Sequence, residues 1–305
     1  MDERVNVAII GAGPAGAAAA MYLKRAGLEP LLLEQAEPGG LLHEANLVEN
    51  YPGFPDGIPG GELASLIARQ LQRLEVRMIE ASAKKVGTSD LAFETITDEG
   101  SFISNAVIIA TGTEPKKTDI LGADAVAGDL LMYGVSKLSA EQIEGKRVAV
   151  LGGGDAAFDY ALNLSDKGGS VTILSRSEPT CLALLAERAR ERNIEIIAGR
   201  DIVGIAETPA GVVITCDDRE GQNEIVCDVV VVAHGRQPRL EILDRSLRDR
   251  IDAAHPPETG VPGLYLAGDV VRGINRQAAI AAGDGVLAAM MIERFFKNAN
   301  GRGSN

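Results

Sequence analysis

The sequence is poor in cysteine. Its 305 residues contain three cysteines, Cys181, Cys216 and Cys227, and no two of them stand close together in the chain. This spacing excludes a small disulfide framework and matches no zinc-site pattern, so we expect no metal. Cys216 and Cys227 flank a predicted hairpin turn, which leaves open a contact between the two thiols across that hairpin.

Long hydrophobic runs and positive charge are also scarce. The apolar stretch from Ala278 to Ile292 is interrupted by Asp284 and is shorter than the roughly 18 to 20 residues that a membrane span needs. With 30 basic and 43 acidic residues the net charge is −13, and an acidic surface repels phosphate. We therefore expect no nucleic-acid or membrane partner. The start, Met1 to Val5, carries no basic segment or cleavage site, which favours a cytoplasmic location.

The rest of the composition is that of a globular protein. Hydrophobic residues make up 46% of the chain and charged residues 24%, and the length allows two domains with separate cores. Several of the 35 glycines stand in turns between apolar runs, which is typical of repeated strand-to-helix turns.

The first such turn has the form of a dinucleotide-binding motif. An apolar strand, Val5 to Ile10, precedes GAGPAG at 11–16, an alanine-rich helix follows, and the next strand ends at Glu34. In this pattern the first glycine allows the tight turn, the second lets the backbone approach a diphosphate, and the third lets the helix pack on the strand. Glu34 is placed to accept hydrogen bonds from a ribose. The alternative is a glycine-rich turn that binds no ligand.

The same pattern returns after residue 146. A strand from Arg147 to Leu151 is followed by the turn GGGDAA at 152–157, a helix, and a second strand that ends near Ser175 and Arg176. A carboxylate at this position would repel a 2′-phosphate, whereas Ser175 and Arg176 could bind one. The sequence therefore favours NADP over NAD. The alternative is that Arg176 is only a solvent-facing residue. The predicted nucleotide contacts of this unit are Gly152, Gly154, Asp155, Ala156, Ser175 and Arg176.

Three further runs end in glycine and predict strands that are buried on both faces. They are Ala106 to Gly112, Val229 to Gly235 and Leu264 to Gly268. Alternating segments near residues 93–104 and 212–228 predict a small antiparallel meander beside each parallel sheet. We therefore predict an α/β protein of two Rossmann-like three-layer domains. One is discontinuous, residues 1–113 and 241–305, and residues 114–240 are inserted into it.

The motifs together resemble the thioredoxin reductase-like pyridine nucleotide flavoproteins over nearly the whole chain. The matching stretches are GAGPAG, residues 38–63, ATG at 110–112, GGGDAA, LYLAGDV at 264–270 and RQAAIAAGDG at 276–285. The resemblance implies FAD in the discontinuous domain, a pyridine nucleotide in the inserted domain, and a homodimer. A departure occurs at Leu41, where the family usually has Gln.

The resemblance also assigns FAD contacts residue by residue. Asn46 and Asn50 would face the flavin edge, and a helix opening at Arg276 would point at the N1 and C2 side of the flavin. A helix N-terminus there stabilises the negative charge of a reduced flavin. The full set of expected FAD contacts is Gly11, Gly13, Pro14, Ala15, Glu34, Gly40, Leu42, Asn46, Asn50, Ala83, Thr111, Gly112, Gly268, Asp269, Arg276, Gln277 and Ala278.

The segment before the second glycine turn departs from the disulfide reductases of this family. Those enzymes carry Cys-x-x-Cys there, whereas Tyr133 to Lys146 contains no cysteine and is shortened. This junction is similar to that of the related ferredoxin or flavodoxin NADP reductases. Two features weigh against that likeness: residues 38–63 look like thioredoxin reductase, and the chain ends soon after Phe296, without the C-terminal extension usual in those reductases. Ser177 also stands where a second basic residue is expected after Arg176, which predicts a lower affinity for the nucleotide.

From these features we predict an FAD-dependent oxidoreductase that passes electrons between NADPH and an acceptor such as ferredoxin or flavodoxin. It uses no internal redox disulfide, and the flavin itself is the reacting group. The alternatives are a ferredoxin-linked disulfide reductase and a flavin-binding protein without turnover. The residues do not identify the electron acceptor.

Overall fold

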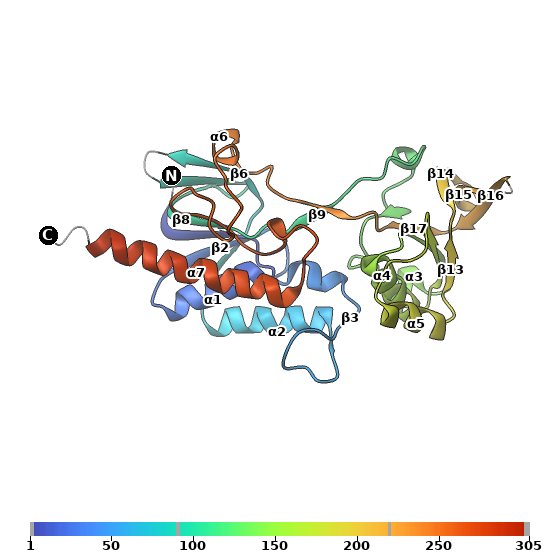
Figure 1. Ribbon diagram of the computed structural model, residues 1–305, viewed down its shortest axis with the longest axis horizontal. Coiled ribbons are helices and arrows are strands. Elements are labelled where there is room, and N and C mark those ends of the chain that lie inside the picture. The colour runs from blue at the N-terminus through green and yellow to red at the C-terminus, as the bar shows by residue number, and fades with distance from the viewer. Residues whose placement is uncertain (1–2, 90–91, 219–220, 302–305) are drawn as a thin grey trace. The chain divides into compact units, whose positions relative to one another are not determined.

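The computed structural model describes residues 3–89, 92–218 and 221–301 and contains two compact units. Unit 1 comprises Met1–His43, Val48–Glu114 and Gln237–Asn305, and unit 2 comprises Glu44–Leu47 and Pro115–Arg236. Both ends of the chain therefore belong to unit 1, which carries the blue and red ends of the colour scale in Figure 1. The chain passes between the units at residues 43/44, 47/48, 114/115 and 236/237, and the last two connections pair as a short sheet of β9 (Thr113–Pro115) and β18 (Arg236–Pro238).

Unit 1 is built on a seven-stranded sheet in the order β5-β2-β1-β8-β7-β6, with β19 paired to β8. The parallel strands are β1 (Glu3–Ile10), β2 (Pro30–Glu34), β5 (Arg77–Glu80), β8 (Ser101–Ile109) and β19 (Leu264–Leu266). The strands β6 (Ala83–Ser89) and β7 (Ala92–Thr97) extend the sheet as an antiparallel meander. The apolar runs that predict buried strands form β8 and β19, so that prediction is confirmed.

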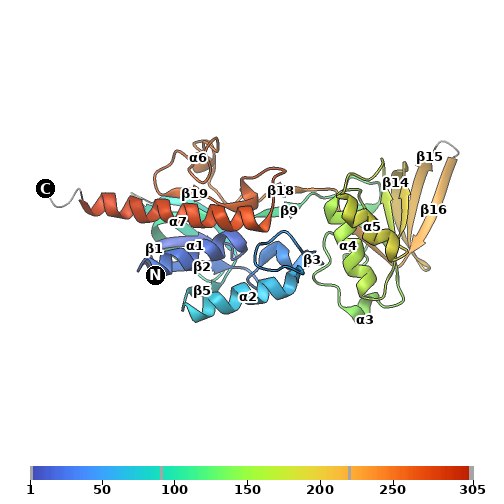
Figure 2. The ribbon, with the colours of Figure 1, turned by 60° about the horizontal axis from the view of Figure 1, so that its bottom comes forward.

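Three helices cover one face of this sheet: α1 (Pro14–Arg25), α2 (Gly60–Arg73) and α7 (Ala278–Gly301). Helices α1 and α7 lie side by side in both ribbon views (Figures 1 and 2). Their approach requires small residues, because a Cβ at Gly285 would lie 1.9 Å from the Ala15 carbonyl oxygen. The opposite face is covered by the segment around α6 (Arg245–Arg248), which packs with Val86, Phe93 and Leu243.

Unit 2 is built on a five-stranded parallel sheet in the order β10-β17-β11-β12-β13. The strands are β10 (Leu131–Met132), β17 (Val229–Val232), β11 (Arg147–Leu151), β12 (Ser170–Ser175) and β13 (Glu195–Ala198). Helix α4 (Asp155–Asp166) buries Phe158 and Leu162 against it, α5 (Ala183–Glu191) packs beside α4, and α3 (Ala140–Ile143) precedes β11. A three-stranded antiparallel sheet of β14 (Asp201–Thr208), β15 (Gly211–Asp218) and β16 (Gly221–Cys227) completes the unit, and this confirms the predicted meander.

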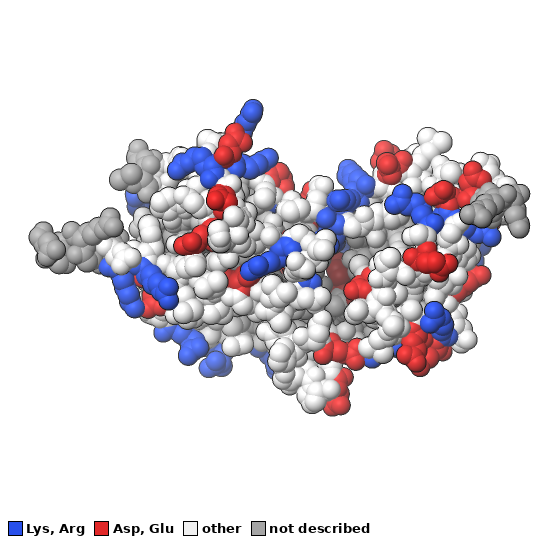
Figure 3. Space-filling model, viewed as in Figure 1, with Lys and Arg blue, Asp and Glu red and all other residues white. Residues whose placement is uncertain are grey.

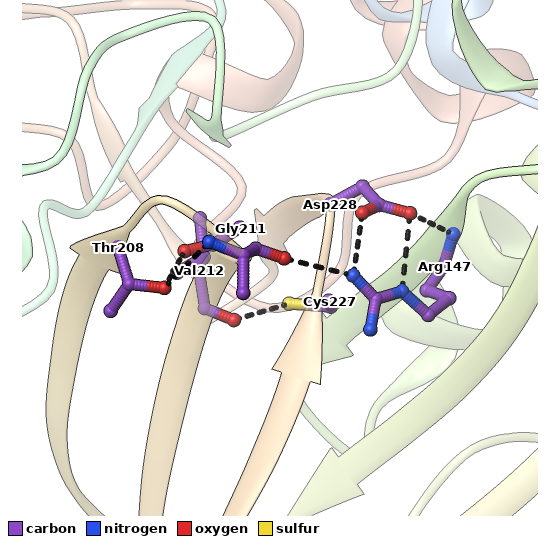
Figure 4. Close-up of polar contacts among 7 residues, drawn as sticks. Arg147, Thr208, Gly211, Val212, Cys227 and Asp228 are labelled. Carbon is purple, nitrogen blue, oxygen red and sulfur yellow. Dashed lines mark hydrogen bonds and ion pairs between the residues drawn. The ribbon is translucent and has the colours of Figure 1, made fainter.

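An ion pair between Arg147 and Asp228 connects the antiparallel sheet of unit 2 to its parallel sheet (Figure 4). The Arg147 guanidinium donates to the Asp228 carboxylate at 2.7 and 3.3 Å, and to the Ala210 carbonyl at 3.1 Å. The Asp228 carboxyl also accepts from the Arg147 backbone N–H, and Arg147 lowers the pKa of Asp228 through these hydrogen bonds. This cluster holds the turn between β14 and β15 at the start of β11.

The register of the β15–β16 hairpin decides the open question about the cysteines. Cys227 lies opposite Val212 and Cys216 lies opposite Asn223, so the two thiols do not face each other. Cys227 donates a weak hydrogen bond to the Val212 carbonyl at 3.5 Å, and burial raises the pKa of Cys227 to about 11. Both are buried free thiols, and their surroundings indicate a packing role.

Among the described residues, no helix has the length and apolar character needed to cross a membrane. The same residues contain no group of three or more His, Cys, Asp or Glu side chains that could hold a metal ion.

Candidate functional site

The first glycine turn of unit 1 closes tightly between β1 and α1. Gly11 has φ +102° and donates its N–H to the Leu33 carbonyl at 2.8 Å. A Cβ at Gly11 would lie 2.4 Å from the Ala110 carbonyl oxygen, and one at Gly16 would lie 1.8 Å from that of Gly11. Neither position tolerates a side chain, which agrees with the tight-turn and helix-packing roles expected of these two glycines.

Gly13, between those two, differs from them because the space beside it is open. No atom lies within 4 Å of a Cβ built on Gly13. Gly40 nevertheless passes nearby, because a Cβ built on Gly40 would lie 3.3 Å from the Gly13 Cα. Gly13 is also the N-cap of α1, Pro14 occupies the first turn, and that turn contains neither a side-chain cap nor an acidic residue. The start of α1 therefore has open space beside Gly13 and no side-chain cap, which fits the diphosphate of a dinucleotide.

Glu34 ends β2 beside this turn. Its Oε2 accepts from the Ala12 N–H at 2.6 Å and its Oε1 from the Ala36 N–H at 3.1 Å. The carboxylate is thus held by two backbone donors next to the glycine turn, at the position where a ribose is expected.

Two further segments with expected FAD contacts adjoin the same turn. The short helix η1 (Gly40–Glu44) carries Gly40 and the buried Leu42, and the Gly39 N–H donates to the Ala12 carbonyl at 2.9 Å. The short helix η3 (Gly268–Val270) carries Gly268 and Asp269, and a Cβ at Gly268 would lie 2.8 Å from the Ala15 Cβ. The structure therefore gathers the segments around residues 11–15, 34, 40–42 and 268–269 in one place.

Hydrogen bonds hold several of the remaining residues of unit 1 that are expected to contact FAD. The Thr111 hydroxyl donates to the Arg239 carbonyl at 2.6 Å, and the Arg239 N–H donates to the Gly112 carbonyl at 3.1 Å. The Asn50 side-chain amide donates to the Gln277 Oε1 at 2.7 Å. Gln277 immediately precedes α7, with Arg276 before it, and Ala278 is its first residue. Ala83 begins β6 and packs in the core cluster on the other face of the sheet.

Asn46 is placed differently from the other expected FAD contacts. It belongs to unit 2, where its side-chain amide donates to Asp166 at 2.8 Å and its backbone N–H donates to Asp159 at 3.1 Å. Glu44 in the same segment accepts from the backbone N–H groups of Val135 and Ser136 at 2.5 and 3.0 Å. The structure thus pairs Asn46 with Asp166 and not with the residues of the FAD set.

Asp284 and Arg272 are site residues that the sequence analysis did not identify. Asp284 is 4% exposed and accepts from the Arg272 Nε at 2.8 Å, from a second guanidinium nitrogen, and from the Gly268 N–H at 3.2 Å. Through these bonds it ties α7 to the turn that carries Asp269. The signal in the sequence was an acidic residue inside an otherwise apolar helix, which requires a buried partner.

The glycine turn of unit 2 repeats the arrangement of unit 1. Gly152 has φ +148°, and a Cβ there would lie 2.8 Å from the Ala233 carbonyl oxygen. Gly154 is the N-cap of α4 and has no atom within 4 Å of its Cβ position. Asp155 and Ala156 follow in the first turn of the helix, and the Asp155 carboxylate accepts from the Leu182 N–H at 2.8 Å. The open space at Gly154 fits a second diphosphate.

Ser175 and Arg176, at the end of β12, differ in how they are presented. Ser175 is 4% exposed and its hydroxyl donates to the Ser177 carbonyl at 2.8 Å, so it does not face solvent. Arg176 is exposed. Of the two residues expected at a 2′-phosphate, only Arg176 is therefore presented to solvent, a distinction that the spacing in the sequence did not reveal.

The comparisons with known proteins agree with this geometry. The family model for pyridine nucleotide-disulphide oxidoreductases matches residues 5–285. The chain belongs to this family. As a pyridine nucleotide-disulphide oxidoreductase it is an NAD(P)H-dependent flavoenzyme, which confirms the prediction of an FAD-type oxidoreductase at that level.

Its relatives include thioredoxin reductases. The mitochondrial thioredoxin reductase 1 of Arabidopsis thaliana is 31% identical over 97% of this chain and 84% of its own length. The thioredoxin reductase of Streptomyces clavuligerus is 33% identical over 97% and 95%. The structure of Lactococcus lactis thioredoxin reductase has a TM-score of 0.86 at 29% identity, covering 95% of this chain and 98% of that one. The predicted α/β class is thereby confirmed as the fold of thioredoxin reductase.

Proposed function

We propose that the protein passes electrons between NADPH and a protein carrier such as ferredoxin or flavodoxin, without an internal redox disulfide. The observation that carries this proposal is the segment from Tyr133 to Lys146, which leads into the second glycine turn without a cysteine. The three thiols of the chain lie elsewhere in unit 2, and two of them are buried. Electrons that reach the flavin therefore have no dithiol of this chain to enter.

The residues divide the work between the two units. Bound FAD supplies hydride acceptance from a nicotinamide and single-electron exchange with a carrier. In unit 1 the start of α1 would bind the FAD diphosphate and Glu34 the ribose, while the N-terminus of α7 would stabilise negative charge on the reduced flavin. In unit 2 the start of α4 would bind the NADPH diphosphate, and Arg176 would favour the 2′-phosphate. No side chain needs to act as acid or base.

A disulfide acceptor is the second candidate. It is favoured by the relatives, because proteins about 30% identical over 97% of this chain are named thioredoxin reductases. In that case the reducible disulfide must belong to the partner, since this chain offers no neighbouring cysteine pair. Ferredoxin would then be the electron donor. The third candidate is a flavin-binding protein without turnover.

Anaerobic reduction of the FAD-loaded protein distinguishes these candidates. We expect NADPH to reduce the flavin in a single-turnover experiment, which is seen as bleaching of the flavin absorbance. The reduced protein should then reduce ferredoxin or flavodoxin but not thioredoxin. The matched variant replaces Cys181, Cys216 and Cys227 with alanine, and it should transfer electrons at a rate within about twofold of the parent, because no thiol takes part. Circular dichroism checks that the variant folds.

Other outcomes redirect the assignment. Bleaching by reduced ferredoxin alone, followed by thiol production from a disulfide substrate, supports the second candidate. A flavin that neither donor bleaches supports the third. Loss of electron transfer in the cysteine-free variant with an intact fold contradicts the proposal.

The surface bears on how an acidic carrier would bind. On the face seen in Figure 3 basic and acidic side chains lie interspersed. In the arginine-rich segment of unit 1, Arg245 pairs with Asp249, and Arg248 donates to the carbonyls of Glu241 and Leu243. We therefore expect weak, salt-sensitive carrier binding. A homodimer, which the family resemblance implies, and a cytoplasmic location, which the sequence features favour, remain proposals, and light scattering of the purified protein tests the dimer.

A further inference from the structure

His234 follows β17 directly beside the glycine turn of unit 2. The Ala233 N–H donates to the Leu151 carbonyl at 2.8 Å, and the Ala233 carbonyl lies 2.8 Å from the Cβ position of Gly152. On the other side of β11, Leu151 is in register with Leu174 of β12, which leads to Arg176. The turn at residues 152–154 is therefore flanked by Arg176 after one neighbouring strand and by His234 after the other.

The carboxyl edge of a parallel sheet is where nucleotides bind in folds of this kind. Arg176 continues from β12, the strand whose end is expected to meet the adenosine ribose, and its partner would be a 2′-phosphate. His234 lies two residues after the end of β17, on the opposite side of the turn, where a diphosphate bound at the start of α4 would be within its reach. His234 is exposed and so accessible to a ligand.

We infer that His234 is a further binding residue of the pyridine nucleotide site, and that its protonated imidazole donates to the diphosphate shared by NAD and NADP. This inference rests on the proposed nucleotide site of unit 2. It separates two roles: Arg176 would distinguish the two nucleotides, whereas His234 would bind both equally.

The charges around His234 fix the direction of the pH dependence. Partial desolvation of the ring by neighbouring atoms and the nearby Arg176 guanidinium lower the pKa of His234, while Asp119 opposes that effect. A bound diphosphate adds negative charge beside the ring and favours the imidazolium. Binding then takes up a proton, so affinity should rise as the pH falls through the range in which histidine titrates, between about pH 7.5 and about pH 5.5.

Calorimetric titration of the FAD-loaded protein with NAD+ and NADP+ tests the inference without catalysis. We expect His234→Gln to weaken both nucleotides by the same factor, about tenfold near pH 6, where a charge-assisted hydrogen bond is lost. Arg176→Gln should weaken NADP+ alone. The pH series uses NAD+, because it has no 2′-phosphate that titrates in this range. His255→Gln, at an exposed position in unit 1, is the control, and thermal melting checks each fold.

The outcomes separate this inference from the proposed function. If the parent binds NADP+ and His234→Gln changes neither nucleotide by more than about twofold, or changes NADP+ alone, the inference is wrong while the nucleotide site stands. A parent whose NAD+ affinity does not change with pH also overturns it. If the parent binds neither nucleotide, both the inference and the nucleotide part of the proposed function fail.

Discussion

Asp284 is a buried carboxylate whose three hydrogen bonds all go to one neighbouring segment, residues 268–272. Its charge is compensated by Arg272, whose side chain is 30% exposed. A buried acid that loses its cation is costly, whereas a neutral pair of the same shape is not. Because η3 carries Asp269, the geometry of this pair determines where Asp269 is presented.

Breaking this ion pair should affect both folding and FAD binding. We expect Arg272→Met to lower the free energy of unfolding of the FAD-free protein by about 2 kcal/mol, because Asp284 is left charged and unpaired. The double variant Arg272→Met, Asp284→Asn should recover at least half of that loss. Urea unfolding measures stability, and quenching of flavin fluorescence measures FAD affinity. Equal losses in the single and double variants would show that the charge is not the cause.

At the scale of elements, the two glycine turns combine tightly packed and open positions. Gly11, Gly16 and Gly152 approach backbone or side-chain atoms of neighbouring segments, so they are needed for folding. Gly13 and Gly154 have open space beside them, so the protein itself does not require glycine there. Glycine at these two positions is what the close approach of a ligand would require, and this is the role we propose for both.

This difference predicts opposite effects for two alanine substitutions in the same turn. Gly13→Ala should change the unfolding free energy of the FAD-free protein by no more than about 0.5 kcal/mol, because its φ of −66° suits alanine, yet it should weaken FAD binding at least tenfold. Gly16→Ala should destabilise the fold by about 2 kcal/mol or more through overpacking against Gly11. Gly61→Ala, at an open and exposed site in α2, is the control. Chemical unfolding and FAD titration measure both effects, and FAD affinity unchanged in Gly13→Ala would contradict the assignment.

At the scale of the whole molecule, one partly buried acid, Asp159, connects folding to pH. Burial raises the pKa of Asp159 from its ordinary value of 3.8 to about 6, although the Asn46 N–H works against this. The folded state therefore holds the proton more tightly than the unfolded state. The stability from this group is fully present below about pH 4 and is lost as the pH rises through about 6.

Asp159→Asn should remove this dependence because the amide stays neutral and can still accept from the Asn46 N–H. We expect the variant to gain stability over the parent as the pH rises from about 4 to about 7.5, by at most about 3 kcal/mol. Guanidinium unfolding across this range measures the difference, with the exposed Asp56→Asn as control. A difference between variant and parent that stays constant with pH would contradict the role of Asp159.

Several features of the molecule follow from short stretches of sequence. The strand–turn–helix units, the glycine positions and the runs buried on both faces are local, because a tight turn and a two-sided burial each impose residue types on neighbours in the chain. The missing cysteine pair is likewise visible in the chain alone. These features were sufficient to predict the α/β class and, through the family resemblance, a flavoenzyme.

Other features depend on segments that are distant in the chain. The register that separates Cys216 from Cys227, the pairing of Asn46 with Asp166, and the bonding of Asp284 to Arg272 were not predictable from spacing. The same holds for the Ser175 hydroxyl, which its own turn occupies. Sequence by itself determined which backbone shapes form, because those shapes depend on neighbouring residues. Only the tertiary structure decided which polar groups meet, because each buried donor and acceptor is satisfied by whatever partner the packing brings to it.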